Sequence, residues 1–183
     1  MSTKVEATIE DLYKVEGKAE LVNGEIILMS PTGCRPGYAG DAISSSLFEY
    51  SKRRKFGRAV GDNKAFVVNL PRRKSFSPDA AFHIGEDTGM KFYNGAPVFA
   101  VEVRSENDYK PSAERRITQK RADYFAAGTQ VVWDVDLLSE DVVRVYRASD
   151  PKRATIYRQG EEAEAEPAVP GWTMMVDELL PPK

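Results

Sequence analysis

Two acidic residues lie in strand-like segments at the centre of the sequence. Glu102 is in the middle of VFAVEVRS, an apolar run rich in β-branched residues, and Asp79 follows Pro78 at the start of another short strand-like segment. An ionised carboxylate in an apolar strand is unfavourable unless a cation or hydrogen bonds compensate its charge. Two such acids on neighbouring strands can share a divalent ion, and hard oxygen ligands favour Mg²⁺ or Mn²⁺ over zinc. The sequence therefore predicts a metal site at Asp79 and Glu102.

Each acid also has a structural interpretation, which the sequence leaves open. Side chains alternate along a strand, so Glu102 and Arg104 share one face and Val101 and Val103 the other. Glu102 could therefore take part in a cross-strand ion pair on the face that carries Arg104. Asp79 could cap the turn after Ser77 and Pro78.

A lysine lies in the apolar stripe of the helix predicted for residues 111–128. Residues spaced four, three, four and three apart form this stripe, namely Ala113, Ile117, Lys120, Tyr124 and Ala127. Directed at a sheet that holds two acids, Lys120 could orient or deprotonate a water, or stabilise negative charge on a phosphate. The alternative is a lysine that lays its aliphatic stem on the core and extends to solvent.

Local signals predict the elements that must position these residues. We expect a helix over 9–15, a hairpin of strands 20–22 and 25–29 around Asn23-Gly24, a helix over 40–55, and a strand over 65–70. Strands at 77–84 and 98–105 carry the two acids, and the helix after them starts at Pro111 and ends at Gly128. Two further strands cover 130–136 and 141–148. From about residue 160 we expect an acidic low-complexity stretch, a Pro-Gly-Trp turn and a short VDELL segment.

Length and composition indicate one intracellular domain over residues 1–183. The chain is 42% hydrophobic, enough for a core, and its one cysteine, Cys34, has no internal disulfide partner. No apolar run approaches the roughly 20 residues needed to span a bilayer, and the N-terminus has no signal-peptide pattern. We therefore expect a cytoplasmic protein that does not bind membranes.

The net charge of −2 excludes a generally basic nucleic-acid-binding protein, but positive charge is clustered. Three runs share this character: Lys52 to Lys55, Arg72 to Lys74, and Arg115, Arg116, Lys120 and Arg121. Such runs can face phosphates, or they can be ordinary solvated surfaces.

Six segments, in their order and spacing, resemble the PD-(D/E)xK nuclease superfamily. They are ELVNGEIILMSPTG, SPDAAF, FAVEVRSEND, KRADYFAAGTQVVWDVD, VRVYR and PGWTMMVDELL. Within the superfamily the chain is most similar to a bacterial family labelled putative restriction endonuclease, first catalogued as a domain of unknown function. No single segment is specific, whereas their combination is.

The resemblance implies an α/β (α+β) fold with a restriction-endonuclease-like core: a mixed central β-sheet flanked by helices, with an N-terminal β-hairpin. It implies that Asp79 and Glu102, helped by the carbonyl of Val103, hold Mg²⁺ or Mn²⁺, and that Glu20 supplies another acid beside the hairpin. It also implies hydrolysis of phosphodiester bonds in DNA. A homodimer is expected by analogy of fold alone.

The sequence departs from the family pattern at several positions. Arg104 stands where the parent motif has a lysine, and arginine stays protonated, so it can contact phosphate but is a poor base. Relatives move the lysine to the following helix, which matches Lys120. Pro36 stands where the family commonly has a histidine, and the proline that usually follows the serine of EVRS is missing. The one histidine, His83, is interpreted as structural.

Two functions from different classes follow. The first is a Mg²⁺-dependent DNA endonuclease with Asp79, Glu102, Lys120 and Glu20 as catalytic residues and Arg104 and Tyr124 as substrate contacts. The second is a catalytically silent nucleic-acid-binding or interaction domain with the same fold. An enzyme acting on another phosphoester is a third, weaker hypothesis.

Overall fold

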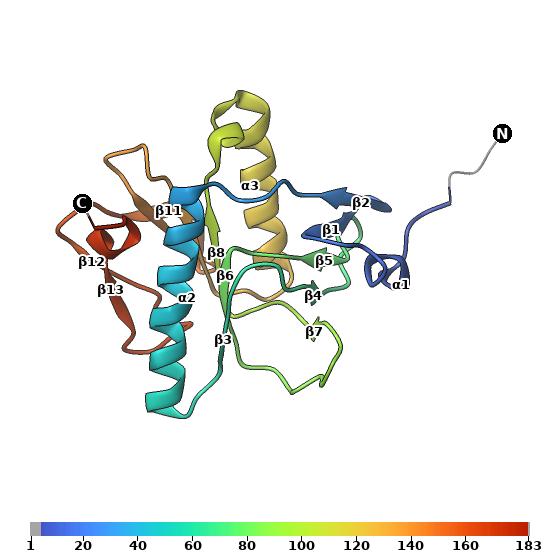
Figure 1. Cartoon of the computed structure of the whole chain (residues 1–183), viewed down its shortest axis with the longest axis horizontal. Coiled ribbons are helices and arrows are strands. Elements are labelled where there is room, and N and C mark those ends of the chain that lie inside the picture. The colour runs from blue at the N-terminus through green and yellow to red at the C-terminus, as the bar shows by residue number, and fades with distance from the viewer. Residues whose placement is uncertain (1–4, 183) are drawn as a thin grey trace.

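The computed structural model of the chain describes residues 5–182, and within them six strands form a central sheet (Figure 1). The strand order is β11-β10-β9-β8-β6-β3. β8 and β9 are parallel, whereas the other neighbouring strands are antiparallel. The sheet is therefore mixed, as predicted, and the strand that carries Glu102 is one of its two middle strands.

The strands of the central sheet are β3 (Arg58–Val60), β6 (Ala80–His83), β8 (Phe99–Val103), β9 (Val131–Val135), β10 (Val143–Arg147) and β11 (Asp150–Tyr157). Three smaller sheets are formed by β1 (Ala19–Val22) with β2 (Glu25–Leu28), by β5 (Ser75–Phe76), β4 (Phe66–Val67) and β7 (Tyr93–Asn94), and by β12 (Glu162–Glu164) with β13 (Thr173–Met175). The helices are α1 (Ile9–Leu12), α2 (Cys34–Arg54) and α3 (Pro111–Ala126), with short 3₁₀ helices η1 (Glu106–Tyr109) and η2 (Val176–Leu179). No helix of the described residues is long and apolar enough to cross a membrane.

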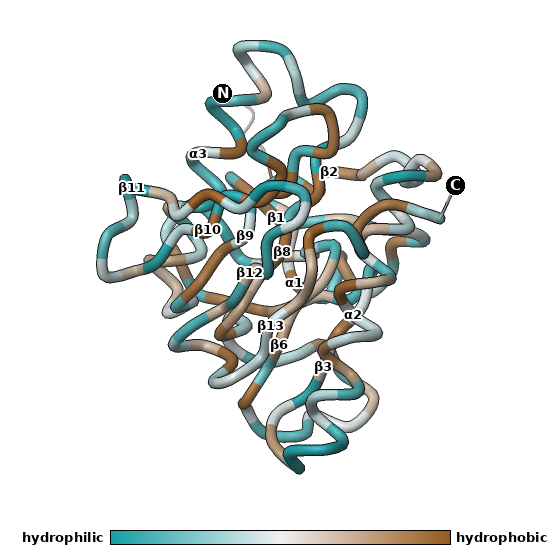
Figure 2. The backbone as a smooth tube through the Cα atoms, turned by 90° about the vertical axis from the view of Figure 1, so that its left-hand side faces the viewer, coloured by the Kyte–Doolittle hydropathy of each residue, from teal (hydrophilic) through white to brown (hydrophobic). Residues whose placement is uncertain are grey.

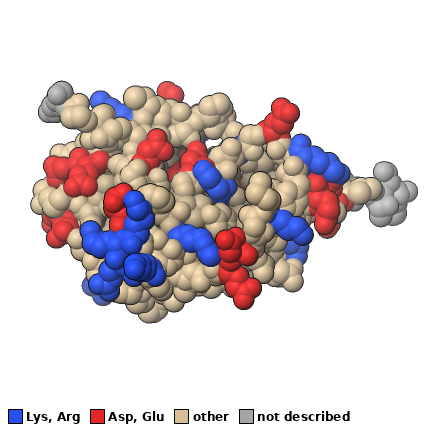
Figure 3. Space-filling view, turned by 60° about the horizontal axis from the view of Figure 1, so that its bottom comes forward, with Lys and Arg blue, Asp and Glu red and all other residues tan. Residues whose placement is uncertain are grey.

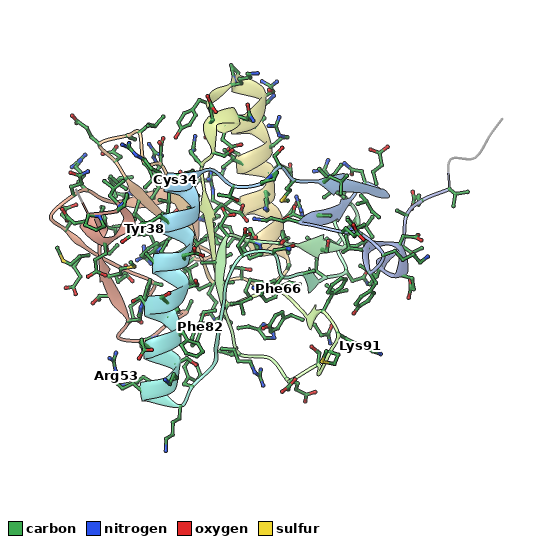
Figure 4. The ribbon with its side chains drawn as sticks, in the orientation of Figure 1. Cys34, Tyr38, Arg53, Phe66, Phe82 and Lys91 are labelled. Carbon is green, nitrogen blue, oxygen red and sulfur yellow. The ribbon has the colours of Figure 1, made fainter. Side chains whose placement is uncertain are left out.

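Helices α2 and α3 lie on opposite sides of the central sheet (Figure 1). Apolar side chains on the α2 side of β6, β8, β9 and β10 pack with α2 and with the C-terminal hairpin in one core cluster. Side chains on the other side pack under α3 and the small sheets in a second cluster. Figure 4 shows the division: Phe82 lies between the sheet and α2, and Phe66 lies on the opposite side. Hydrophobic stretches accordingly coincide with the inner strands in Figure 2, while many connecting segments are hydrophilic.

The N-terminal elements follow their local signals. Thr8 and Asp11 form the capping box of α1, although the helix ends at Leu12 instead of continuing to residue 15. Asn23 and Gly24 both have positive φ, 52° and 71°, as a type I′ turn requires, and β1 pairs with β2 around them. The hairpin prediction is confirmed.

Helix α3 and strands β6, β8, β9 and β10 match their predictions. α3 begins at Pro111 and stops before Gly128, which has φ +104°. Phe99, Val101 and Val103 belong to the α2-side core, whereas Ala100 belongs to the α3-side core, so the predicted alternation of β8 is confirmed. Glu102 therefore faces α3.

Other segments differ from the predictions. α2 begins at Cys34 rather than at residue 40. Pro36 is tolerated in its first turn because a backbone N–H at this position would have no acceptor within the helix. Strands β3 and β11 were not predicted, since β3 has three residues and β11 is mostly polar. The acidic stretch is not a low-complexity tail: Ala163 and Ala165 are fully buried and β12 pairs with β13.

Candidate active site

Asp79 directly precedes β6, and Glu102 lies on the neighbouring strand β8. In the antiparallel pair β6–β8, Ala80 is opposite Val101 and Ala81 is opposite Ala100. At the end of this pair the Asp79 N–H donates to the carbonyl of Val101 at 3.0 Å, which places Asp79 beside Val101 and Glu102. Ala81, two residues after Asp79, and Ala100, two residues before Glu102, both belong to the core on the α3 side. The two acids therefore converge on the α3 side of the sheet.

Two donors hold the Asp79 carboxylate. Its Oδ2 accepts the backbone N–H of Val103 at 2.7 Å, and its Oδ1 lies 2.6 Å from Nζ of Lys18. The first contact ties Asp79 to the residue whose carbonyl was predicted as a ligand. The side chain keeps 16% of its surface exposed, so solvent still reaches the carboxylate.

The Glu102 carboxylate is bound from α3. Nζ of Lys120 lies 2.8 Å from Oε1 of Glu102, and the Tyr124 hydroxyl donates to the same oxygen at 2.6 Å. Lys120 and Tyr124 are four residues apart, so consecutive turns of one helix face deliver both groups to Glu102. Lys120 is thus directed at the sheet and not at solvent.

Lys120 also reaches Glu20 on the N-terminal hairpin. Its Nζ lies 2.8 Å from Oε1 of Glu20, a carboxylate that further accepts the N–H of Ser77 at 2.8 Å and an N–H of Arg73 at 2.6 Å. The side chain of Glu20 is 4% exposed and every oxygen has a protein donor. Glu20 therefore positions Lys120 and joins the hairpin to the site.

Burial and ion pairing set the protonation states of these groups. Burial raises the pKa of the Glu102 carboxyl above its ordinary value; the Lys120 ammonium opposes this shift, and the charge of Asp79 adds to it. Burial alone lowers the pKa of Lys120, but the charges of Glu102 and Glu20 outweigh it and raise the pKa. Burial likewise raises the pKa of Glu20, yet Lys120 and Arg73 hold it below its usual value. Lys120 is therefore an ammonium in this arrangement, suited to stabilising negative charge and not to accepting a proton.

Tyr124 is fully buried, and its ring stacks on Phe76 at 4.0 Å between centroids. Burial, with the charge of Glu102 next, raises the pKa of its hydroxyl well above the ordinary value. In this arrangement Tyr124 donates a hydrogen bond that positions Glu102, and its predicted contact with substrate stays a prediction.

Arg104 is on the same face as Glu102, as predicted, but its guanidinium is committed elsewhere. It donates to both oxygens of Asp134, at 2.8 and 2.7 Å, and to both oxygens of Glu114, at 2.7 and 3.2 Å. Asp134 is buried, whereas the Glu114 side chain is 54% exposed. A contact between Arg104 and a phosphate would require release of Glu114.

Sequence reasoning missed two cations of the site, Lys18 and Arg73. Lys18 is two residues before Glu20 in an extended segment, so strand alternation could have placed the two on one side. Arg73 belongs to the second basic run, for which the sequence left open a phosphate-facing or a solvated surface. Its side chain is buried, and it also pairs with Asp123 of α3 at 2.9 Å. Nothing local distinguishes Arg73 from its exposed neighbour Arg72.

The basic runs divide between surface and interior. Lys52 to Lys55 at the end of α2 are exposed, whereas Arg73 and Lys120 turn inward to carboxylates. Figure 3 shows basic and acidic side chains interspersed on one face of the molecule, with one larger basic group. His83 is 3% exposed, and its ring packs against Phe66 and Tyr93, which agrees with a structural role.

The carboxylates of Asp79 and Glu102 suit a divalent ion that keeps several water ligands. Across residues 5–182, no group of three or more His, Cys, Asp or Glu side chains is arranged to hold a metal. Mg²⁺, however, is commonly bound by one or two carboxylates while it keeps several waters. Asp79 and Glu102 supply two hard oxygen donors, and the ammonium already seated against Asp79 marks a position where positive charge is favoured.

The family model of Uma2, described as "Putative restriction endonuclease", matches residues 7–177. The chain belongs to the Uma2 family. A crystal structure from Anabaena variabilis ATCC 29413, described as a putative nuclease belonging to DUF820, has a similar fold: the TM-score is 0.71 at 18% sequence identity, over 94% of this chain and 97% of that one. A search of curated proteins finds no match. The Uma2 assignment and the mixed sheet between α2 and α3 agree with the resemblance stated from the sequence.

Proposed function

We propose that this Uma2 protein is a divalent-metal-dependent endonuclease that hydrolyses phosphodiester bonds in DNA. The supporting observation is the proximity of Asp79, at the start of β6, to Glu102 on β8, with the Lys120 ammonium 2.8 Å from Glu102. Two acids and one amine on one face of a mixed sheet are the groups that a metal-assisted phosphodiesterase needs. The family description and the similar nuclease-like fold support the same reaction class.

In this proposal Asp79, Glu102 and the carbonyl oxygen of Val103 would hold Mg²⁺ or Mn²⁺. When bound, the ion supplies Lewis acidity and positive charge beside the scissile phosphate. Asp79 is held for this role by the Val103 N–H, and Glu102 by the Tyr124 hydroxyl.

Lys120 would supply the second positive charge. Because Glu102 and Glu20 keep it protonated, it would stabilise the charge that builds up on the phosphate and donate a hydrogen bond to it, without acting as a base. Glu20 would hold the amine in place from the hairpin side. The proton of the attacking water would pass to solvent or to the phosphate, since the ammonium cannot accept it.

DNA is the proposed partner, contacted by phosphate-binding side chains outside the acidic centre. Arg104 remains a proposed phosphate contact on condition that Glu114 releases it. A homodimer and a cytoplasmic location stay predictions.

The test is a plasmid-nicking assay with Mg²⁺ or Mn²⁺ on the wild type, Asp79→Asn, Glu102→Gln and Lys120→Met. Glu49→Gln is the matched control, because it neutralises an exposed carboxylate on α2, on the other side of the sheet. We expect each site variant to lose at least about a hundredfold in rate and the control to keep its rate within about threefold. Circular dichroism melting checks that each variant is folded.

Nicking that survives both carboxylate changes would place the activity elsewhere. A wild type that binds DNA in EDTA, with an affinity that falls steeply with salt, but never nicks it would favour the silent binding domain.

A further inference from the structure

Lys18 holds a position that the proposed reaction does not use. Its Nζ lies 2.6 Å from Oδ1 of Asp79 and 2.7 Å from Oδ1 of Asp62. Its side chain is 12% exposed, so this ion pair is largely shielded from solvent. The oxygen that would face a divalent ion is thus already in contact with a positive charge.

The backbone fixes Lys18 at this place. Its carbonyl accepts the N–H of Met29 from the opposite arm of the hairpin at 2.9 Å, one step beyond the Ala19–Leu28 pair. Strand alternation then points Lys18 to the same side as Glu20, which anchors the hairpin to Lys120. The lysine is therefore held toward the carboxylates by the same segment that completes the site.

Both carboxylate oxygens of Asp79 have protein donors, but of different kinds. The Val103 N–H belongs to the rigid centre of the sheet, whereas the Lys18 ammonium ends a flexible four-carbon chain. A divalent ion at Oδ1 would repel an ammonium less than 3 Å from that oxygen. Metal binding at Asp79 therefore requires Lys18 to move.

Asp62 offers the displaced lysine a partner. It lies in the loop after β3, and its side chain, at 39% exposed, is more open to solvent than that of Asp79 at 16%. A small rotation of the lysine chain away from Asp79 can keep the Asp62 contact. Lys120 has no such alternative, because its two partners, Glu20 and Glu102, both lie within the buried site.

We propose that Lys18 is a resident counter-ion of the metal site: its ammonium competes with the divalent ion for Asp79 and withdraws toward Asp62 when the metal binds. The inference rests on the proposed metal site at Asp79 and Glu102. Lys18 thereby weakens metal binding, and it keeps the paired acids neutralised when no metal is present.

The first test measures Mn²⁺ and Mg²⁺ affinity by titration calorimetry without DNA. Lys18→Met removes the ammonium and keeps the length of the side chain. Lys64→Met is the matched control, because Lys64 is exposed and bonds the backbone carbonyl of Asp62 at 2.9 Å, so the same charge is lost nearby without any contact to Asp79. We expect Lys18→Met to bind metal about tenfold more tightly or better, and Lys64→Met to change affinity less than about threefold.

Adding Asp79→Asn to Lys18→Met should abolish the gain. An affinity in Lys18→Met equal to or weaker than that of the wild type would overturn the proposal, as would an equal gain in Lys64→Met.

The second test uses the unmodified protein, so it does not depend on the folding of a variant. Lysine ammonium signals in ¹⁵N-labelled protein report ion pairs directly, and we expect saturating Mg²⁺ to shift the Lys18 signal while the Lys120 signal stays in its buried ion-pair range. An unmoved Lys18 signal at full metal occupancy would refute the displacement.

Neither experiment involves DNA cleavage. Tighter metal binding by Lys18→Met together with an inactive wild type would support the counter-ion role and count against the nuclease. Nicking that depends on Asp79, with unchanged metal affinity in Lys18→Met, would support the nuclease and overturn the counter-ion role.

Discussion

Lys120 on α3 and Glu102 on β8 form an ion pair of 2.8 Å across the interface between helix and sheet. The pair links α3 to β8. Because the same amine also binds Glu20, three distant parts of the chain meet at one nitrogen. Stability and the proposed activity therefore depend on the same contacts, and variants can separate the two.

Replacing Lys120 with methionine should destabilise the fold by about 3–5 kcal/mol, because buried Glu20 and partly buried Glu102 lose the cation that they share. The double variant Lys120→Met/Glu102→Gln should recover much of that loss while remaining inactive. Urea denaturation measures both effects, and Arg116→Met, on the exposed face of α3, is the control. Equal stabilities of the single and double variants would show that the pair is not coupled.

Tyr124→Phe removes one hydrogen bond and keeps the ring stacked on Phe76. A hydrogen bond to a charged group is worth about 1.5–3 kcal/mol, so we expect a modest fall in stability and, at fixed metal, a loss of at least about tenfold in single-turnover nicking. Tyr109→Phe, which removes a hydroxyl bonded to Asp136, is the control and should keep its rate. If both variants nick at the wild-type rate, Tyr124 does not position Glu102.

Arg104→Met should cost about 3–5 kcal/mol in the free energy of unfolding, since it leaves buried Asp134 with Arg121 alone, at 3.7 Å. Glu114→Gln removes the exposed partner of the same arginine and should cost less than about 1 kcal/mol. Chemical denaturation compares the two. A similar loss for both would mean that the Arg104–Asp134 pair is not the stabilising contact.

The carboxyl of Asp11, in the capping box of α1, should titrate at low pH. The backbone hydrogen bond from Thr8, followed by the Lys14 side chain, lowers the pKa of Asp11 from 3.8 to about 2. A carboxyl whose pKa is depressed by folding adds stability above its unfolded value, and this contribution is lost as the pH falls from 3.8 toward 2. Carboxyl NMR of Asp11 measures the midpoint of the titration. Thr8→Ala removes the hydroxyl donor but keeps the backbone N–H, so it should move the midpoint only part of the way toward the ordinary value. A wild-type midpoint near 3.8 would contradict the prediction.

Local signals were sufficient for the elements that carry the acids and the amine. Asn23-Gly24 sets the hairpin, Pro111 and Gly128 bound α3, and alternation places Glu102 on the face opposite Val101. Each of these depends on neighbours within a few residues. The proximity of Asp79, Glu102 and Lys120 could be predicted on the assumption that the two strands carrying the acids are adjacent.

Non-local packing explains what the sequence did not reveal. Ala163 and Ala165 lie among glutamates in an acidic stretch, and only the pairing of β12 with β13 turns them inward. Arg73 and Arg72 are adjacent and chemically alike, yet only Arg73 meets Glu20, which is more than 50 residues away in the chain. Partner choice of this kind depends on tertiary contacts that composition does not record.

Strand β11 ends the order of the central sheet, so one of its edges pairs with β10 while the other meets no strand of the described residues. Its second residue is Pro151, which has no N–H to donate, and the exposed cations Lys152 and Arg153 follow. These features oppose the addition of a further strand, and with it sheet-to-sheet aggregation. Self-association through a continuous intermolecular sheet is thus disfavoured at this edge, and the predicted homodimer is expected to form through side-chain contacts instead.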